Sequence, residues 1–141
     1  MQLKTEILSF RTKGHTDIID ITSRLQRVVE ENRFKEGLVC LFVIGSTASV
    51  TTVEFEPGLV ESDLPALFEK LAPYRANYAH HGTWGDDNGA AHLRASLLGS
   101  SLTVPFSKSK LLLGTWQQVI LLDFDTRSRN RELVAQLWGI K

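Results

Sequence analysis

The sequence contains a single cysteine, Cys40, among its 141 residues. One thiol cannot form an intramolecular disulfide, so we expect a protein of a reducing compartment. Cys40 stands within an apolar run from Leu38 to Ile44, and a reactive thiolate needs an electropositive, partly open setting. We therefore interpret Cys40 as a buried small hydrophobic residue.

An excess of charge of either sign is also absent. Lysine and arginine together number 16, aspartate and glutamate together number 16, and the formal net charge is zero. Such a balance gives no general attraction to nucleic acid, to membrane surfaces or to acidic partners. Any recognition of an anion must therefore come from a local group of side chains.

Long apolar segments are missing as well. The first ten residues carry charges and no apolar stretch of the kind found in signal peptides, and no apolar run is long enough to cross a bilayer. We therefore expect a cytoplasmic protein. The 43% of hydrophobic residues and 23% of charged residues are ordinary for globular proteins, and no linker or repeat divides the chain. This predicts one domain over residues 1–141.

The hydrophobic pattern predicts many strands and few helices. Strands are expected over residues 1–11, 38–44, 50–55, 101–106, 110–113, 117–124 and 133–138, with 38–44 buried on both faces. One helix follows Asp20 or Thr22 and ends before Gly37, and a second begins at Ser62. The polar segment 80–91 is expected to be a loop. The pattern predicts a compact α+β domain with a mainly antiparallel sheet and two or three helices.

Three of the four histidines gather in the polar segment 80–92, at positions 80, 81 and 92, together with Asp86 and Asp87. Imidazole is the commonest metal ligand in proteins, and carboxylates often complete such a site. No HxxxH or HExxH spacing is present, so spacing alone favours solvated loop histidines. His15 stands apart and is expected at the surface.

Two further polar groups follow apolar strands. The segment Gly45-Ser46-Thr47 can offer backbone N–H groups and hydroxyls to an anion, although a plain turn explains the same residues. Glu54 can act as a general base or metal ligand, and a solvated carboxylate is the simpler interpretation.

The last third of the chain holds a run of alternating charges and an aromatic residue beside a glycine. Between residues 123 and 131 every charge falls on one face of an extended chain, and Arg127 suits bidentate binding of phosphate. The alternative is a solvated face of compensating charges. Trp116 can form the wall of a ligand pocket, whereas its spacing alone favours the core.

Taken together and in order, these segments resemble the YjbQ-like family, also called the secondary thiamine-phosphate synthase family. The resemblance covers nearly the whole chain and is clearest from Leu38 to Arg131. It rests on residues 45–48, 51–54, 78–80, 86–92, 95–99, 101–105 and, most tellingly, the Leu-Leu-Gly-Thr-Trp-Gln-Gln segment 112–118. Many members carry histidine where this chain has Gly45. The Gly-Ser-Thr branch, which this chain resembles, often has histidines at the positions of Gly85 and Ala90.

The resemblance implies a YjbQ-like fold and a homotrimer with sites near its subunit interfaces. It also implies a histidine-containing site that binds a divalent metal, zinc first, and no organic cofactor. By position, the metal ligands are His80 and His92. The catalytic residues are Glu54, Asp86 and His92, and the ligand contacts are Ser46, Thr47, Thr115, Trp116, Gln117 and Arg127.

The activity that the resemblance implies joins a hydroxymethylpyrimidine diphosphate to a thiazole phosphate and releases pyrophosphate. The sequence lacks the aspartate-rich or glycine-rich diphosphate motif of a dedicated enzyme, which favours a weak, secondary activity. The alternative is a non-catalytic trimer that binds a small phosphorylated metabolite. In either case we expect the rings of His80 and His92 to lie together, and Trp116 and Arg127 to line the same pocket as these histidines. One pocket holds both only if Arg127 comes from a neighbouring subunit or if the chain bends back after Asp125.

Overall fold

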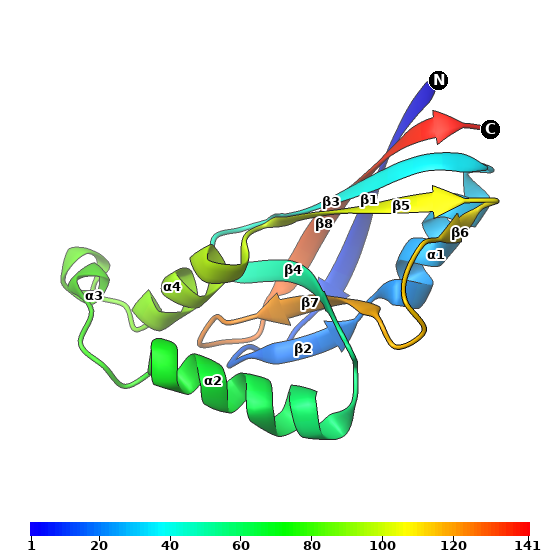
Figure 1. The fold of residues 1–141 in the computed structure, drawn as a ribbon. Helices are drawn as coiled ribbons and strands as arrows, with labels where there is room; N and C mark the ends of the chain where they lie inside the picture. The colour runs from blue at the N-terminus through cyan, green and yellow to red at the C-terminus, as the bar shows by residue number, and fades with distance from the viewer.

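Eight strands form two antiparallel sheets in the computed structural model, which describes residues 1–141 (Figure 1). The large sheet has the order β1-β8-β3-β5-β6, with bounds Gln2–Arg11, Asn130–Ile140, Glu36–Ile44, Ser101–Ser107 and Lys110–Leu111. The small sheet has the order β2-β7-β4, with bounds Asp17–Asp20, Gln118–Asp123 and Ala48–Val53. Because β8 pairs with both β1 and β3, the two chain termini lie side by side.

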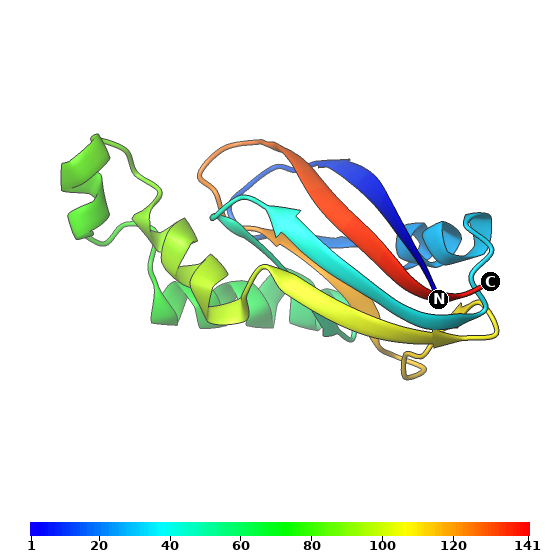
Figure 2. The same ribbon diagram turned by 90° about the horizontal axis from the view of Figure 1, so that it is seen from above.

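Four α-helices and one π-helix complete the fold. They are α1 Thr22–Glu31, a π-helix Gly58–Asp63 that continues into α2 Leu64–Leu71, α3 Ala79–Trp84 and α4 Gly89–Leu98. The α1 helix begins where Asp20 Oδ1 accepts hydrogen bonds from the amide and hydroxyl of Thr22, at 2.9 and 2.6 Å. The predicted α+β fold with mainly antiparallel sheets is confirmed. Seen from above, α3 projects at one end of the molecule (Figure 2).

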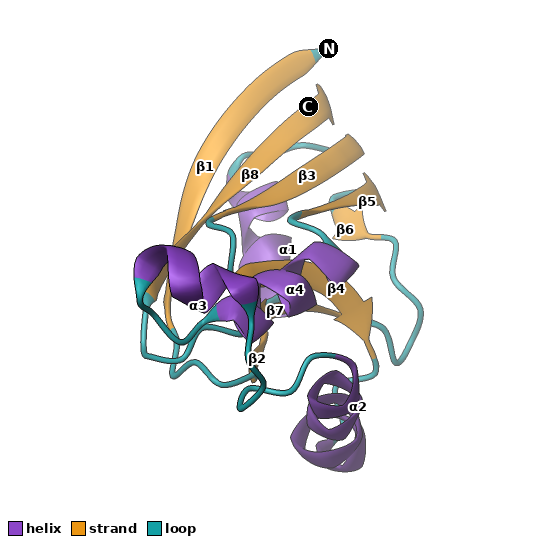
Figure 3. Cartoon of the chain, turned by 90° about the vertical axis from the view of Figure 1, so that its left-hand side faces the viewer, coloured by secondary structure: helices purple, strands orange, loops and turns teal.

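Two hydrophobic cores lie on the two faces of the small sheet. Figure 3 shows the small sheet between the large sheet and α2. The larger core lies between the inner face of the large sheet, α1 and one face of the small sheet, and includes Leu25, Val39 and Leu121. The smaller core joins the opposite face of the small sheet to α2 and α4, through Phe68, Ala95 and other residues. The three-layered arrangement places α4 directly over the start of β4, where the Ser49 hydroxyl donates to the Ala95 carbonyl at 2.9 Å.

The strand that is buried on both faces is β7 rather than β3. Residues 119–124 are all buried, and Val119 to Leu122 alternate between the two cores. In β3 only one face is covered, because Leu38, Phe42 and Ile44 are exposed, and Cys40 is half-buried on the same outer face. The prediction that residues 38–44 are buried on both faces is wrong within one chain. An apolar run does not reveal whether the chain itself covers both faces of the strand.

Two further expectations are corrected. Residues 80–91 are mostly helical, in α3 and the first turn of α4, and not a loop. Gly37 belongs to β3 and does not end α1; a side chain there would collide with the backbone carbonyl of Trp138 on the neighbouring strand. Position 37 therefore requires glycine because β3 and β8 approach each other closely there. None of the helices reaches the length and apolarity that crossing a bilayer requires.

Candidate functional site

The junction of α3 and α4 brings His80 and His92 together. A turn at Gly85, with φ of 69°, reverses the chain between the two helices. The imidazole ring centroids of the two histidines then lie 4.5 Å apart. Residues twelve positions apart in sequence therefore share one site, and their rings do not lie on opposite faces.

His81 has a different task from its neighbour. Its Nε2 atom accepts a hydrogen bond from the Gly89 amide, the first residue of α4, at 3.0 Å. Its ring also packs edge-on against Tyr78, with centroids 5.4 Å apart. Accepting this bond requires an unprotonated Nε2. His81 thus holds the start of α4 in place, which sets the distance between His80 and His92.

Two buried polar atoms in this segment have no hydrogen-bond partner, His80 Nε2 and Asn88 Oδ1. His80 Nε2 lies 3.4 Å from Asp86 Oδ2, within ion-pair distance but without the geometry of a hydrogen bond. Most buried polar atoms in proteins are paired, so each unpaired one calls for an explanation. Both atoms thus have hydrogen-bonding capacity that the chain itself does not use.

The donor set does not fit a three-ligand zinc site. Catalytic zinc is held by three protein ligands and a water. Here His80 Nε2 and Asp86 Oδ2 form one close pair with the ring of His92 beside it. No group of three or more histidine, cysteine, aspartate or glutamate side chains is placed to hold a metal ion.

The surroundings of His92 lower its pKa below the usual value for histidine. Burial is the main cause, and the nearby His80 adds to it; Asp125, Asp86 and the backbone at Ser46 oppose the shift. The imidazole of His92 is therefore neutral at neutral pH. A neutral ring has one nitrogen that accepts a proton or hydrogen bond and one that donates.

We expect His80→Gln to raise the pKa of His92, because the substitution removes a neighbouring positive charge. The lowered pKa of His92 also links folding stability to pH. The unfolded chain protonates His92 near pH 6.5, while the folded chain does so only at lower pH. Protonation of His92 therefore lowers the free energy of unfolding as the pH falls from 6.5 to the pKa of His92 in the folded chain. Below that pKa the contribution of His92 no longer changes with pH. NMR titration of the His92 ring protons checks the shift, with His15→Gln as control; an unchanged His92 pKa in His80→Gln contradicts it.

A pocket of about 400 Å³ opens beside His92. Its lining comes from the β3–β4 turn, from one face of α4 and from the turn that follows α4: Gly45, Ser46, Ala48, His92, Ala95, Ser96, Gly99 and Ser100. Ser46, predicted as a ligand contact, thus lines the same pocket as His92. Ser96 was missed by sequence reasoning, although it follows His92 by four positions and a helix brings such residues to one face. Recognition of α4 would have found it.

Behind this pocket lies a buried network of charged side chains. Arg131 Nε and Nη2 donate to the two carboxylate oxygens of Asp123 at 2.7 and 2.8 Å, and Nη2 also donates to the Thr47 hydroxyl at 2.6 Å. The Thr47 hydroxyl in turn donates to Asp125 Oδ2 at 3.1 Å. The interpretation of residues 123–131 as a solvated charged face is therefore wrong for Asp123, Asp125 and Arg131, which are buried.

Two consequences of the network concern predicted site residues. Thr47 is buried and its hydroxyl is engaged on both sides, so it supports the pocket from behind and does not line it. A side chain at Gly45, where φ is 141°, would come within 2.8 Å of Arg131 Nη1. A histidine at that position would therefore need Arg131 to move.

The other predicted residues lie at the far end of the small sheet. Ala48 pairs with Asp123 at one end of β4 and Val53 pairs with Gln118 at the other, which separates the ends by about 17 Å for a strand of this length. Glu54 and the 114–117 loop belong to the second end. Within one chain, Glu54, Thr115, Trp116 and Gln117 are therefore remote from His92.

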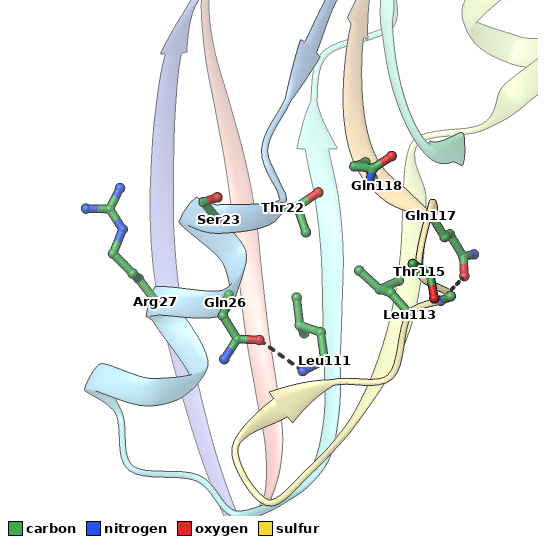
Figure 4. A pocket seen from close by; sticks show the side chains of 10 residues that line it. Thr22, Ser23, Gln26, Arg27, Leu111, Leu113, Thr115, Gln117 and Gln118 are labelled. Atoms are coloured by element: carbon green, nitrogen blue, oxygen red, sulfur yellow. Dashed lines mark hydrogen bonds between the residues drawn. The ribbon is translucent and has the colours of Figure 1, made fainter. Parts of the chain in front are cut away.

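The loop at this second end borders a pocket of about 620 Å³ between α1, β6 and the start of β7 (Figure 4). Thr115 and Gln117 line this pocket. Much of its polar surface is used internally, because Gln117 Oε1 accepts from the Gly114 amide at 3.0 Å and its Nε2 donates to Thr52. Trp116 is 71% exposed, so the expectation of a core position is wrong.

Arg127 lies at the same end as the histidines. The adjacent Thr126 hydroxyl donates to Asp87 Oδ1 at 2.7 Å, which ties the loop after β7 to the α3–α4 turn. The Arg127 side chain is exposed and makes none of the hydrogen bonds or ion pairs in the chain. Trp116 and Arg127 thus flank opposite ends of β7, and the pocket predicted to hold both does not exist within a single chain.

Comparison with known proteins agrees with this architecture. The sequence model of the family described as "UPF0047 protein YjbQ-like" matches residues 6–140. A UPF0047 protein of Archaeoglobus fulgidus is 40% identical over 130 residues, 92% of this chain and 98% of the relative. A UPF0047 protein of Methanothermobacter thermautotrophicus is 35% identical over 139 residues, 99% of this chain and 94% of the relative.

Solved structures are similar over the same span. A hypothetical protein from Aeropyrum pernix has a TM-score of 0.89 at 26% identity, covering 96% of this chain and 98% of its own. A YbjQ-like protein of unknown function from Sulfolobus solfataricus has a TM-score of 0.86 at 28% identity, covering 98% and 99%. With matching sequence and fold over nearly its full length, the chain belongs to the UPF0047 family of YjbQ-like proteins.

Proposed function

We propose that the His80–His92 site binds a small phosphorylated metabolite and supports a weak, secondary reaction of the thiamine-phosphate synthase type. The observation that supports this most is a neutral His92 beside His80 and Asp86, at the mouth of a pocket lined by Ser46 and Ser96. The Ser96 hydroxyl donates to the Leu93 carbonyl at 2.8 Å, so Ser46 is the hydroxyl donor offered to a ligand. Imidazole N–H groups and hydroxyls are donors suited to phosphate oxygens.

In the proposed reaction a carbon–nitrogen bond forms between the thiazole and the pyrimidine methylene. The carbon–oxygen bond to the diphosphate breaks, and its electron pair leaves with pyrophosphate. Charge on this leaving group must be stabilised by positive groups aimed at it. Arg129 and Arg131 are both held by buried carboxylates, which leaves the exposed Arg127 as the arginine of this loop without a carboxylate partner. This accounts for a weak reaction.

We expect His92→Gln to reduce formation of thiamine phosphate from the two phosphate substrates by about 10²-fold, the lower end of what loss of one hydrogen-bond donor aimed at developing charge costs. His15→Gln serves as the control, because His15 is exposed and lies outside the pocket. Product is quantified chromatographically over long incubations. Equal turnover in both variants contradicts a role for His92.

The second candidate is a binding protein without turnover. The commitment of Arg129 and Arg131 to buried carboxylates favours it, since binding a phosphate needs less stabilisation than expelling pyrophosphate. In this case the wild-type chain binds the substrates measurably by calorimetry, His92→Gln weakens that binding, and neither protein forms product.

We also propose weak binding of a divalent ion, zinc first, by His80 and His92 with Asp86 nearby. Two or three ligands without a closed site hold an ion less firmly than three fixed histidines. We expect the zinc content to fall well below one per chain on dialysis against a chelator, and zinc titration to broaden the His80 and His92 ring signals first. Zinc that resists the chelator contradicts weak binding.

Self-assembly into a homotrimer is the third part of the proposal. One observation in its support is the outer face of the large sheet, where exposed apolar side chains stand in rows across the strands: Leu3, Ile7, Leu38, Phe42, Ile44, Trp138 and Ile140. A contiguous exposed apolar face of this kind marks an interaction surface.

The division of the site supports cyclic assembly in particular. One end of the small sheet carries His80, Asp86 and His92, and the other carries Glu54 and Trp116. Two different patches that meet between copies make a head-to-tail interface, and such interfaces close into rings. In a ring the Glu54 end of one subunit can complete the histidine end of the next.

A further inference from the structure

A small notch lies where β1 ends and β8 begins, beside the loop that follows β7. Its volume is about 120 Å³, and its lining consists of Arg11, Ser128, Arg129 and Asn130. None of these residues lines the pocket beside His92. The notch contains two guanidinium groups, one hydroxyl and one amide, and no carboxylate.

The backbone around the notch is fixed by hydrogen bonds. Arg11 pairs with Asn130 in the register of β1 and β8. The Thr12 amide donates to the Arg129 carbonyl at 2.8 Å, and the Arg129 amide donates to the Thr12 hydroxyl at 3.2 Å. Arg11 and Asn130 thus belong to paired strands, and the loop residue Arg129 is tied to Thr12 by two hydrogen bonds.

Arg129 is oriented by a buried carboxylate. Its Nε and Nη2 atoms lie 2.8 and 2.7 Å from Asp125 Oδ2. Burial alone would raise the pKa of Asp125, but the Thr126 amide, Arg129 and Thr47 outweigh it and hold the pKa below its ordinary value. The carboxylate is therefore ionised at neutral pH. A guanidinium has five N–H groups, so Arg129 retains donors for a second partner in a fixed orientation.

Arg11 has no partner of its own. It takes part in no ion pair and in no side-chain hydrogen bond, and it lines the same notch as Arg129. Arg129 is paired with Asp125, so Arg11 carries the positive charge of the notch that no carboxylate of the chain neutralises. A negative group bound in the notch pairs with that charge.

We propose that the notch binds a phosphate group. Guanidinium pairs match the tetrahedral oxygens of phosphate through several N–H donors, and Ser128 and Asn130 add donors that a carboxylate, with two oxygens, would leave unused. Whole small-molecule pockets measure about 300–1,000 Å³. The notch thus receives the phosphate alone, and the rest of a phosphate ester lies outside.

This site is separate from the proposed reaction at His92. Asp125 stands between the two, with Thr47 bonded on one side and Arg129 on the other. Arg127 does not line the notch and takes no part in this site.

The test is titration of the full chain with inorganic phosphate at low ionic strength, followed by calorimetry and by the amide NMR signals of Ser128 and Asn130. We expect Arg11→Gln to weaken phosphate binding about tenfold, the loss of one charge-assisted hydrogen bond. Arg24→Gln on the exposed face of α1 and Arg127→Gln in the same loop as Ser128 are the matched controls and retain wild-type affinity.

Further measurements distinguish a site for phosphate esters from a site for free phosphate, and define the results that contradict the proposal. Phenyl phosphate that binds as tightly as inorganic phosphate supports a notch open to esters, whereas inorganic phosphate bound alone supports a site for the free ion. Equal affinity in Arg11→Gln and wild type, or displacement by chloride at the same concentration, overturns the proposal. Turnover at the His92 site is expected to be unchanged in Arg11→Gln, so failure of the notch and failure of the proposed function remain distinguishable.

Discussion

We expect Arg131→Met to lower the free energy of unfolding by about 3–5 kcal/mol, because it leaves the carboxylate of a buried ion pair without its partner. Arg131 and Asp123 are both buried and joined by two hydrogen bonds, at 2.7 and 2.8 Å. Methionine fills a similar volume, so the loss reflects charge and hydrogen bonding more than a cavity. Urea denaturation followed by circular dichroism measures the change.

Arg127→Met is the matched control. Arg127 is exposed and unpaired, so its substitution is expected to change stability by less than about 0.5 kcal/mol. The double variant Asp123→Leu with Arg131→Met removes both charges, and we expect it to recover much of the lost stability. An Arg131→Met protein as stable as wild type contradicts the role given to the network.

The second large effect concerns assembly. We expect Trp138→Glu to convert the proposed trimer into a monomer. In the register of the large sheet Trp138 lies between Leu3 and Leu38, and this row carries no charged side chain on the outer face. Interface cores are depleted of charged residues. Burying an unpaired carboxylate there costs several kcal/mol and therefore opposes association of the subunits.

Sedimentation velocity over a range of concentrations measures this effect. Leu67→Glu is the control, because Leu67 is an exposed leucine on α2, away from the outer face of the large sheet. It is expected to leave the oligomer intact. A wild-type protein that sediments as a monomer at all concentrations contradicts the assembly, and an intact Trp138→Glu trimer contradicts this surface.

Most regular elements were predictable because their pattern is local. The spacing of Leu25, Val28 and Val29 marks α1, and the alternation from Leu133 to Leu137 marks β8. The helices that carry the histidines were not predictable in this way. The α3 helix is six residues long and contains a glycine, and its position depends on the contacts of His81 with Gly89 and Tyr78. Tertiary contacts therefore overrode a weak local preference.

Site residues were predictable where the amino-acid type alone indicates the role, and not where burial or tertiary contacts determine it. His80, Asp86 and His92 were singled out by type and by resemblance, and they gather within one chain. The burial of Asp123, Asp125 and Arg131 was not predictable, because charged residues are rarely buried and their pairing depends on Thr47, more than 70 positions away. Glu54 and Trp116 were singled out as well, but their distance from His92 depends on sheet geometry that no local pattern encodes.

The position of β8 has a consequence for how the chain acquires its structure. This strand is the last of the eight in sequence, yet it lies inside the large sheet and pairs with β1 on one side and β3 on the other. During synthesis, β1 has no partner in the sheet until residues 130–140 have left the ribosome, and the edge of β3 that β8 later covers stays open. Contacts between such distant segments form slowly, and open strand edges invite association between chains. Newly made chains are therefore most prone to aggregate before residues 130–140 emerge, and a chaperone that shields strand edges is expected to raise the yield more than a lower temperature alone.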